Sequence, residues 1–424
     1  MKPEWKEALR QVGPGFITGV ADDDPSGIAT YSQAGARFGT AMLWVSLFTF
    51  PLMAAVQEIS ARIGRVSGHG LAGNIRRHYP PGLMYMVVVL IAISNIINIG
   101  ADIGGMAASM ELVLGRDRLH LYPVAISVVS VVALTVLSYS AYSSLLKWLG
   151  LCVFAYVGIV FFVQIPWPEV ARDTLVPRLQ FSHGYLSMLT AVLGTTISPY
   201  LFVWQSSLEV EEQRNTPHEA PVRIAPSQAR QQFMKIRVDT YLGMAVSNAV
   251  MFFIILTAAV TLNAHGITQV ESAEQAARAL EPVAGRHAFL LFAIGVIGTG
   301  MLAVPTLAGS LGYAMGEAFR WRTGLDYKPY QARRFYAVIA VATLLGMAMN
   351  FIGIDPIRAL IASAVINGIL SVPLLFLLLS IARNPKVMGR FVIPRRLAVP
   401  GWITAVLMAC SAGLTLVDLG LSLA

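Results

Sequence analysis

The chain has 424 residues, of which 56% are hydrophobic and 13% charged, with a formal net charge of +8. A soluble protein carries roughly a quarter charged residues, so this composition excludes an ordinary soluble domain and indicates a protein embedded in a lipid bilayer. The two cysteines, Cys152 and Cys410, stand in apolar runs, and the seven histidines are scattered over loops and span ends. These positions exclude a disulfide framework and a zinc site built from clustered Cys and His.

Eleven stretches are apolar enough, and long enough at about 20 residues each, to cross a bilayer core. We predict all-α membrane spans at about 14–38, 41–63, 83–113, 121–141, 148–165, 187–208, 239–263, 287–318, 332–353, 357–382 and 398–420. The chain is expected to be a single transmembrane domain over 1–424. Its first repeat covers about 14–165, its second about 187–382, and an extra span about 398–420.

The connections between spans carry most of the 31 Lys and Arg residues in alternate positions. The positive-inside rule then places the N-terminus in the cytoplasm and, after eleven spans, the C-terminus outside the cell inner (plasma) membrane. The positive net charge follows from this topology, so no nucleic-acid partner is expected. In the connection after span seven, the stretch ITQVESAEQAARAL has apolar residues at helical spacing and predicts a short amphipathic helix.

Two spans are interrupted by polar residues and a proline. Span one contains DDDPSG around Pro25, and span six contains GTTISPY around Pro199. Proline removes a backbone donor, and irregular backbone survives in a bilayer only where protein or a water-filled cavity surrounds it. Paired breaks at the start of two five-span blocks are typical of transporters with inverted repeats.

Two compatible roles can be assigned to Asp24: helix N-cap and cation ligand. An Asp before a Pro is an ordinary helix N-cap, which explains Asp24 and Pro25 without any ligand. Capping does not explain Asp22 and Asp23, or a helix that begins in mid-membrane. Ionisable residues at that depth are costly and indicate function. We therefore predict a cation site.

The donors at the two breaks are oxygen atoms. The carbonyls of Ala21 and Thr195 are expected to lose their intrahelical partners and become free acceptors. Hydroxyl groups at Thr195, Thr196 and Ser198 join the Asp24 carboxylate. Such hard ligands suit magnesium, calcium or manganese.

The stretches GPGFITGVADDDPSGIATYSQAGARFG and QEISARIGRVSG, with the proline-broken span six, resemble the natural resistance-associated macrophage protein (NRAMP) family. The resemblance covers nearly the whole chain. It implies the leucine-transporter fold, with spans 1–5 and 6–10 as inverted repeats and broken helices 1 and 6. It also implies divalent metal import, with no cofactor beyond the transported ion.

The chain departs from the family at several ligand positions. Where the family has Asp-Pro-Gly-Asn, this chain ends the motif in Gly27, and where it has Met-Pro-His, this chain has Ser198 and Tyr200. A second family histidine falls at Gln205. In span three Asp102 matches a family acid, but Gly105 stands where the second acid would be. The chain thus lacks the family's soft ligand, the Met thioether, and most of the acid and histidine residues linked to proton movement. In this it resembles the NRAMP-related magnesium transporters.

The predicted metal site comprises Asp24, Ala21, Gly27, Thr195, Ser198, Asp23 and Asn367, with Asp102 as a candidate relay. For Asn367 of span ten, a plain interhelical hydrogen bond is the alternative. Asn95 and Asn98 of span three are interpreted as packing groups, and Glu58 with Arg62 as a local ion pair.

The predicted function is import of a hard divalent cation such as Mg²⁺, with Mn²⁺ tolerated, by alternating access with weak or no proton coupling. The expected partners are the metal ion and the lipid bilayer, and the oligomeric state stays open. Two alternatives are a proton-coupled Mn²⁺/Fe²⁺ transporter of the same family and a sodium-coupled organic-solute symporter of the same fold. An intramembrane enzyme is not expected, because no second Asp motif faces the first.

Overall fold

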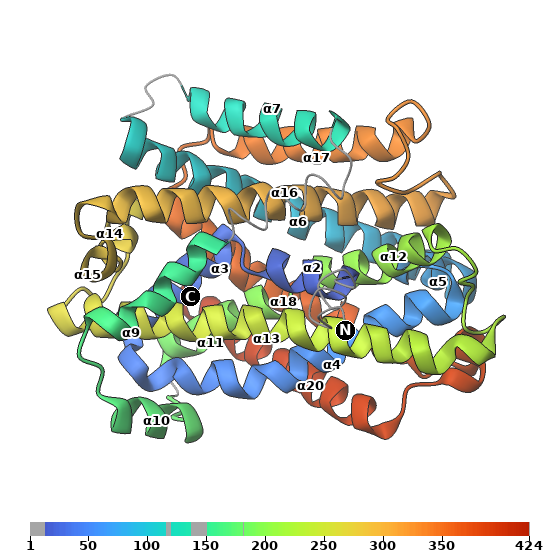
Figure 1. The fold of residues 1–424 in the computed structure, drawn as a ribbon, viewed down its shortest axis with the longest axis horizontal. Coiled ribbons are helices and arrows are strands. Elements are labelled where there is room, and N and C mark those ends of the chain that lie inside the picture. Colours follow the sequence, from blue (N-terminus) through green and yellow to red (C-terminus); the bar gives the residue numbers. More distant parts are fainter. Residues whose placement is uncertain (1–12, 116–119, 137–150, 181, 424) are drawn as a thin grey trace, which may run out of the picture.

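The structure is a computed structural model that describes residues 13–115, 120–136, 151–180 and 182–423. All regular structure within these ranges is helical (Figure 1). The first half contains α2 (Pro14–Asp22), α3 (Pro25–Phe38), η1 (Gly39–Met42), α4 (Leu43–Ser67), α5 (Leu71–His78), α6 (Pro81–Leu114), α7 (Leu121–Val136), η2 (Leu151–Gly158), α9 (Ile159–Phe162) and α10 (Trp167–Leu175). The second half contains α11 (His183–Thr196), α12 (Pro199–Asn215), α13 (Ala229–Thr261), α14 (Ala273–Arg278), α15 (Glu281–Ala284), α16 (Ala288–Phe319), α17 (Arg333–Met349), α18 (Pro356–Ala382), α19 (Pro385–Met388) and α20 (Arg395–Leu423).

Most predicted spans have a helix in the expected place. Seven helical segments of the described ranges are long and apolar enough to cross a membrane, and α7 is a shorter apolar helix. The count of eleven spans stays a prediction. One continuous helix over 148–165 is wrong for the described part of that stretch, which forms η2 and the short α9. Residues 148–150 lie outside the described ranges.

The broken helices lie in the interior, and each broken pair packs against a helix of the other half of the chain. The first pair, α2 and α3, packs against α13, while α12 of the second pair packs against α4 and α11 packs against α18. Two long helices, α6 of the first half and α16 of the second, pack against each other and run across the molecule in Figure 1. The two halves are therefore interlocked, and neither buries its broken helix alone.

Glycine allows the closest of these contacts. A Cβ atom at Gly19 of α2 would collide with the backbone of Gly243 on α13. On the other broken helix, a Cβ at Gly194 of α11 would collide with the backbone of α18 at Gly368. Small residues at such crossings bring two helix backbones together, which is how membrane helices pack without a hydrophobic driving force.

Polarity is distributed as a bilayer requires. Large apolar side chains are exposed on outer helices, among them Val129 of α7 (52% exposed) and Leu344 of α17 (54%). Polar side chains such as Asp22, Asn95 and Asp102 are fully buried in the interior. A soluble protein shows the opposite arrangement, so lipid is the solvent that this surface suits.

The connection after α13 differs from the predicted amphipathic helix. Within the predicted stretch 267–280, helical structure is confined to α14, which begins at Ala273. The preceding residues 267–271 are not helical, because the side chain of Gln33 on α3 holds their backbone. Its Oε1 accepts from the Val270 amide at 2.7 Å, and its Nε2 donates to the Thr268 carbonyl at 3.2 Å. A tertiary hydrogen-bond pair thus overrides the local helical pattern.

Candidate metal centre

The two interruptions form where the sequence predicts them. The first lies at Asp23 and Asp24, between α2 and α3, and the second at Ile197 and Ser198, between α11 and α12. Each second half-helix starts with a proline at its first position, which suits proline because no intrahelical donor is needed there. Asp24 caps α3 by accepting from the Gly27 amide at 2.7 Å.

Side chains from the two breaks come close to each other beside Gly27. A Cβ atom added to this glycine would lie 3.5 Å from Asp24 Oδ1, on its own break, and 3.4 Å from Thr195 Oγ1, on the other. The Thr195 hydroxyl is buried and has no hydrogen-bond partner. A carboxylate and an unpartnered hydroxyl from two different helices therefore converge on one point, which is the arrangement an oxygen-ligated cation requires.

The break carbonyls are less free than predicted. Tyr200 Oη donates to the Ala21 carbonyl at 3.3 Å, and Ser198 Oγ lies 2.7 Å from the Thr195 carbonyl. The prediction of unpartnered carbonyls is wrong, because hydroxyl groups from the second break reach them. Each carbonyl oxygen has a second lone pair that remains available for a ligand.

Asp22 and Asp23 do not join Asp24 as a triad. Both carboxylates accept from Ser247 Oγ of α13, at 2.7 Å for Asp22 and 3.2 Å for Asp23. Within the described ranges, no three His, Cys, Asp or Glu side chains converge so as to hold a metal ion. Asp24 is thus the acid that faces the other break, and its two neighbours are attached to α13.

Asn98 is a residue whose role the sequence interpretation missed. Its Nδ2 lies 3.4 Å from Asp24 Oδ2, and its Oδ1 is buried without a partner. The interpretation as a packing group is wrong for Asn98 but confirmed for Asn95, which donates to the Leu307 carbonyl and to Ser310 Oγ. Asn98 precedes Asp102 by one helical turn, so the two share a face of α6; that spacing was the available signal.

Asn367 forms the interhelical hydrogen bond that was the alternative for it. Its Oδ1 accepts from Ser94 Oγ at 2.5 Å, which joins α18 to α6, while its Nδ2 is buried without a partner. No hydrogen bond between Asn367 and either break is found within the described ranges.

Asp102 is buried on α6 near the first break. Neither carboxylate oxygen forms a hydrogen bond of ordinary geometry, although the group interacts electrostatically with Asp24 and with the Ser26 backbone amide. At Gly105, one turn further on, a Cβ atom would lie 2.8 Å from Leu360 Cδ1. A leucine therefore occupies the space that a second acid on this face would need.

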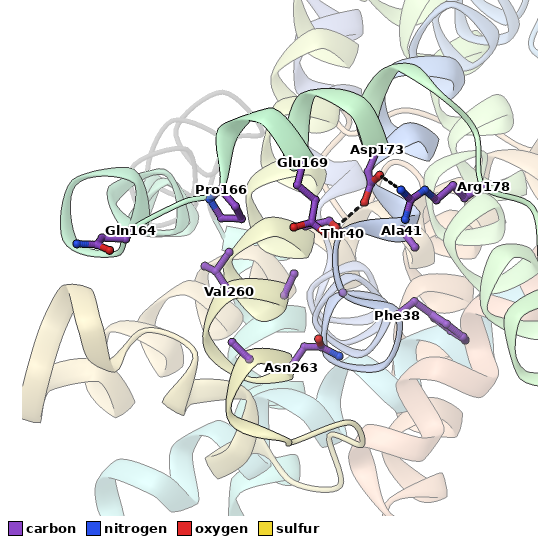
Figure 2. A pocket seen from close by; sticks show the side chains of 13 residues that line it. Phe38, Thr40, Ala41, Gln164, Pro166, Glu169, Asp173, Arg178, Val260 and Asn263 are labelled. Atoms are coloured by element: carbon purple, nitrogen blue, oxygen red, sulfur yellow. Dashed lines mark hydrogen bonds and ion pairs between the residues drawn. The ribbon is translucent and has the colours of Figure 1, made fainter.

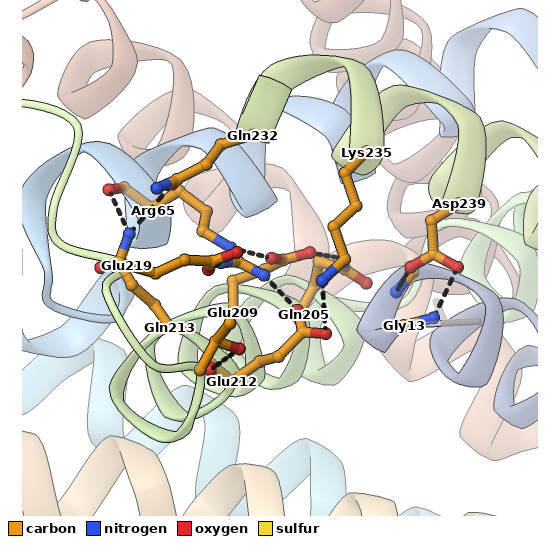
Figure 3. A network of polar contacts seen from close by, with 12 residues as sticks. Gly13, Arg65, Gln205, Glu209, Glu212, Gln213, Glu219, Gln232, Lys235 and Asp239 are labelled. Atoms are coloured by element: carbon orange, nitrogen blue, oxygen red, sulfur yellow. Dashed lines mark hydrogen bonds and ion pairs between the residues drawn. The ribbon is translucent and has the colours of Figure 1, made fainter. Parts of the chain in front are cut away.

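A larger polar network lies at one end of the bundle (Figure 3). Arg65 of α4 forms ion pairs with Glu209, Glu212 and Glu219. Gln205, at the position of a family histidine, donates to Glu209 at 3.0 Å and so belongs to this network. The predicted Glu58–Arg62 pair is confirmed at 2.6 Å.

A cavity of about 360 Å³ opens beside η1 and α10 (Figure 2). Its buried acid, Asp173, is already neutralised by Arg172 and Arg178, each at 3.1 Å, and accepts from Thr40 Oγ1 at 2.7 Å. The lining includes none of the predicted metal-site residues. Asp173 is thus compensated, and the other acid of the lining, Glu169, is exposed, so this cavity lacks the buried, unpaired acid found at the first break.

Comparisons with known proteins identify the family of the chain and agree with the fold. The family model described as natural resistance-associated macrophage protein-like matches residues 15–418. The divalent metal cation transporter MntH of Klebsiella pneumoniae (strain 342) is 29% identical over 415 residues, which cover 96% of this chain and 94% of that protein.

Solved structures show the same architecture. The manganese transporter of Eremococcus coleocola, in complex with an aromatic bis-isothiourea substituted compound, superposes with a TM-score of 0.77 at 19% identity, over 99% of this chain and 87% of that one. Mhp1, a nucleobase-cation-symport-1 family transporter in a closed conformation with bromovinylhydantoin bound, gives 0.56 at 15% identity, over 96% and 92%. The predicted all-helical, leucine-transporter-type fold is confirmed.

Proposed function

The chain belongs to the natural resistance-associated macrophage protein family, and from that premise we propose that it carries divalent metal ions across the plasma membrane by alternating access. The observation that carries the proposal is the convergence of Asp24 and the unpartnered Thr195 hydroxyl from two interrupted helices. The relative in Klebsiella pneumoniae is a divalent metal cation transporter, which supports the same class of substrate. Membership of a transporter family also argues against an enzyme.

The shared fold alone does not select the substrate, since Mhp1 has it too and carries a nucleobase-type solute with a cation. The site favours a metal ion. Three buried acids, Asp22 to Asp24, stand at the first break, and no Lys or Arg of the described ranges forms an ion pair with them. Such a site would repel the carboxylate of an organic acid and attract a cation.

Within the metal-transporter class, we propose a preference for hard ions, magnesium first and manganese second. The proposed direct ligands are oxygen atoms of Asp24, Thr195, Ser198 and the Ala21 carbonyl, with Asp23, Gly27 and Asn367 around them. Magnesium dehydrates reluctantly and binds through few protein ligands plus retained waters. None of these proposed ligands is a sulfur atom, and the thioether of Met251 contacts Thr196 Oγ1 at 3.7 Å.

The absence of a side chain at Gly27 does not leave an enlarged pocket. A Cβ atom there would lie 3.3 Å from the Tyr31 ring, tighter than ordinary contact. Tyr31 therefore occupies the space beside Gly27. The proposed preference for magnesium is supported by the hard oxygen ligands and not by a larger pocket.

Weak or absent proton coupling also remains part of the proposal. Asp102 is the candidate relay acid on α6, and Leu360 occupies the space beside Gly105. In liposomes that contain the protein and an internal pH dye, metal uptake should leave the internal pH nearly unchanged. Acidification that accompanies metal entry would favour the proton-coupled Mn²⁺/Fe²⁺ alternative.

A matched pair of aspartates tests the main claim. Asp24 and Asp355 both cap a helix in front of a proline, accepting from the amides of Gly27 at 2.7 Å and Arg358 at 2.9 Å. Asparagine keeps the capping oxygen and removes the charge. In a liposome uptake assay with radioactive manganese, Asp24→Asn should nearly abolish transport and Asp355→Asn should leave it unchanged. Equal uptake by both variants would refute the assignment of Asp24.

Selectivity is tested at Ser198. Ser198→Met should increase cadmium and manganese binding relative to magnesium, because a thioether is a soft donor. Calorimetric titration of wild type and variant with the three ions measures this directly. Tight cadmium binding by the wild type, without a response to magnesium, would overturn the magnesium preference and leave the transport proposal standing.

A further inference from the structure

A second cavity, of about 290 Å³, lies where the ends of α12 and α16 meet α5 and the segment after α16. These segments are far apart in the sequence, and all belong to the side of the bilayer predicted to be cytoplasmic. Its basic lining residues are His69, Arg76, Arg77, Arg214, Arg320 and Arg322.

The one acid in the lining offsets only part of this charge. Glu317 is the carboxylate that faces the cavity, and it accepts from the amides of Gly70 at 3.0 Å and Gly73 at 2.8 Å and from Ser207 Oγ at 3.3 Å. Its oxygens are thus engaged in holding the first turn of α5. Within the described ranges, none of the five arginines forms an ion pair.

Arg76 has donors that face into the protein without an acceptor. Its Nε and Nη1 atoms are buried and make no hydrogen bond. Burial and the neighbouring guanidinium groups of Arg320 and Arg77 lower the pKa of Arg76. Burial and Arg77 also lower the pKa of His69, to about 4, so the histidine adds no charge at neutral pH.

Arg320 occupies a backbone position that usually takes glycine. It ends α16 with φ +61°, in the left-handed region. The positive-inside rule explains why a cytoplasmic loop is basic. It does not explain why an arginine stands at position 320, where glycine is favoured, or why five arginines line one cavity.

We propose that this cavity is an anion-binding site that takes a phosphate group, carried either by a lipid headgroup or by a small soluble phosphate. Arginine matches phosphate oxygens with paired, charge-assisted hydrogen bonds. Basic pockets between membrane helices are suited to phospholipid headgroups. The inference uses no residue of the metal centre and does not depend on the transported ion.

The experiment measures binding to the purified full-length protein in detergent. Calorimetry with inorganic phosphate and with pyrophosphate tests the soluble source, and native mass spectrometry with phosphatidylglycerol, against phosphatidylcholine, tests the lipid source. Arg320→Gly suits the backbone and should keep or raise the melting temperature. Combined with Arg76→Gln, it should weaken binding by about tenfold or more. Arg230→Gln, an exposed arginine on α13 outside the cavity, is the matched control.

The experiment distinguishes three outcomes: a soluble phosphate ligand, a lipid ligand and no specific site. Binding of phosphate or pyrophosphate that the double variant loses and the control keeps supports the site and identifies a soluble ligand. Retention of phosphatidylglycerol with the same variant pattern supports the site and identifies a lipid. Equal binding of all probes by the wild type, the double variant and Arg230→Gln would overturn the proposal.

Discussion

Two buried polar regions of this protein contain several acids each and differ in what compensates them. In the network around Arg65, the guanidinium group contacts three glutamates, and Lys235 contacts Glu212 at 2.9 Å (Figure 3). At the first break, three aspartates are more deeply buried than Glu212 and Glu219, and their partners are neutral groups: the Gly27 amide, Asn98 and Ser247.

The difference separates a structural role from a ligand-binding role. A buried acid that is paired contributes to the fold, and removing its partner leaves an uncompensated charge. A buried acid with neutral partners is costly by itself, and it becomes favourable when a cation binds. The Arg65 network should therefore matter mainly for stability, and the Asp24 region mainly for ion binding. Four predictions test this division.

The largest expected effect on stability is that of Arg65→Gln. Glu209, 1% exposed at its side chain, would lose its cationic partner. Breaking a buried pair of this kind costs about 3–5 kcal/mol. Thermal unfolding in detergent measures the loss. The control is Arg278→Gln, which breaks an exposed pair with Glu274 and should leave the melting temperature near the wild-type value. Equal melting temperatures for the two variants would remove the proposed difference between the regions.

The next effect is stabilisation by the transported ion. A divalent ion at 100 times its dissociation constant should stabilise the wild type by about 2.7 kcal/mol. The ion should stabilise Arg65→Gln by the same amount, although this variant is less stable than the wild type without the ion. It should not stabilise Asp24→Asn. The melting temperature is measured with and without the ion. If Asp24→Asn is stabilised as much as the wild type, Asp24 is not the principal ligand.

Ser247→Ala tests whether Asp22 and Asp23 bind the metal ion together with Asp24. The variant removes the hydroxyl that donates to Asp22 and Asp23, at a cost of about 1–3 kcal/mol for unsatisfied buried acceptors. Because Ser247 does not contact Asp24 Oδ1, apparent metal affinity should change much less than in Asp24→Asn. Calorimetry and thermal unfolding of the same sample separate the two quantities. A loss of affinity as large as that of Asp24→Asn would place Asp22 and Asp23 among the ligands.

The smallest effect is expected from Asp239→Asn, at the edge of the Arg65 network. Asp239 accepts from the amides of Gly13 at 3.0 Å and Gly15 at 2.7 Å, with one carboxylate oxygen for each. Asparagine retains one acceptor, so about 1 kcal/mol of stability should be lost. Metal affinity should stay at the wild-type value. A change in affinity without a change in stability would show that this contact acts on the metal centre instead.

Features that depend on covalent geometry and on the solvent were predictable from the sequence. Pro25 and Pro199 cannot continue an α-helix from the preceding turn, so both interruptions were predicted in the stretches where they occur. Composition predicted a membrane protein, because a bilayer accepts charged residues only sparingly. The Asp24 cap and the Glu58–Arg62 pair are local contacts, three and four residues apart, and were predictable for that reason.

Tertiary structure decided which distant groups meet. The spacing of Asn98 from Asp102 puts both on one face of α6, but it does not say that the Asn98 amide reaches Asp24. Nothing near Gln33 indicates that it holds residues 268–270 out of a helix. The partners of Arg65 on α12 and the hydroxyl groups that occupy the break carbonyls likewise come from other helices. Side-chain hydrogen bonds act over about 3 Å, so which of them form depends on how the interlocked halves pack, and local sequence carries no record of that packing.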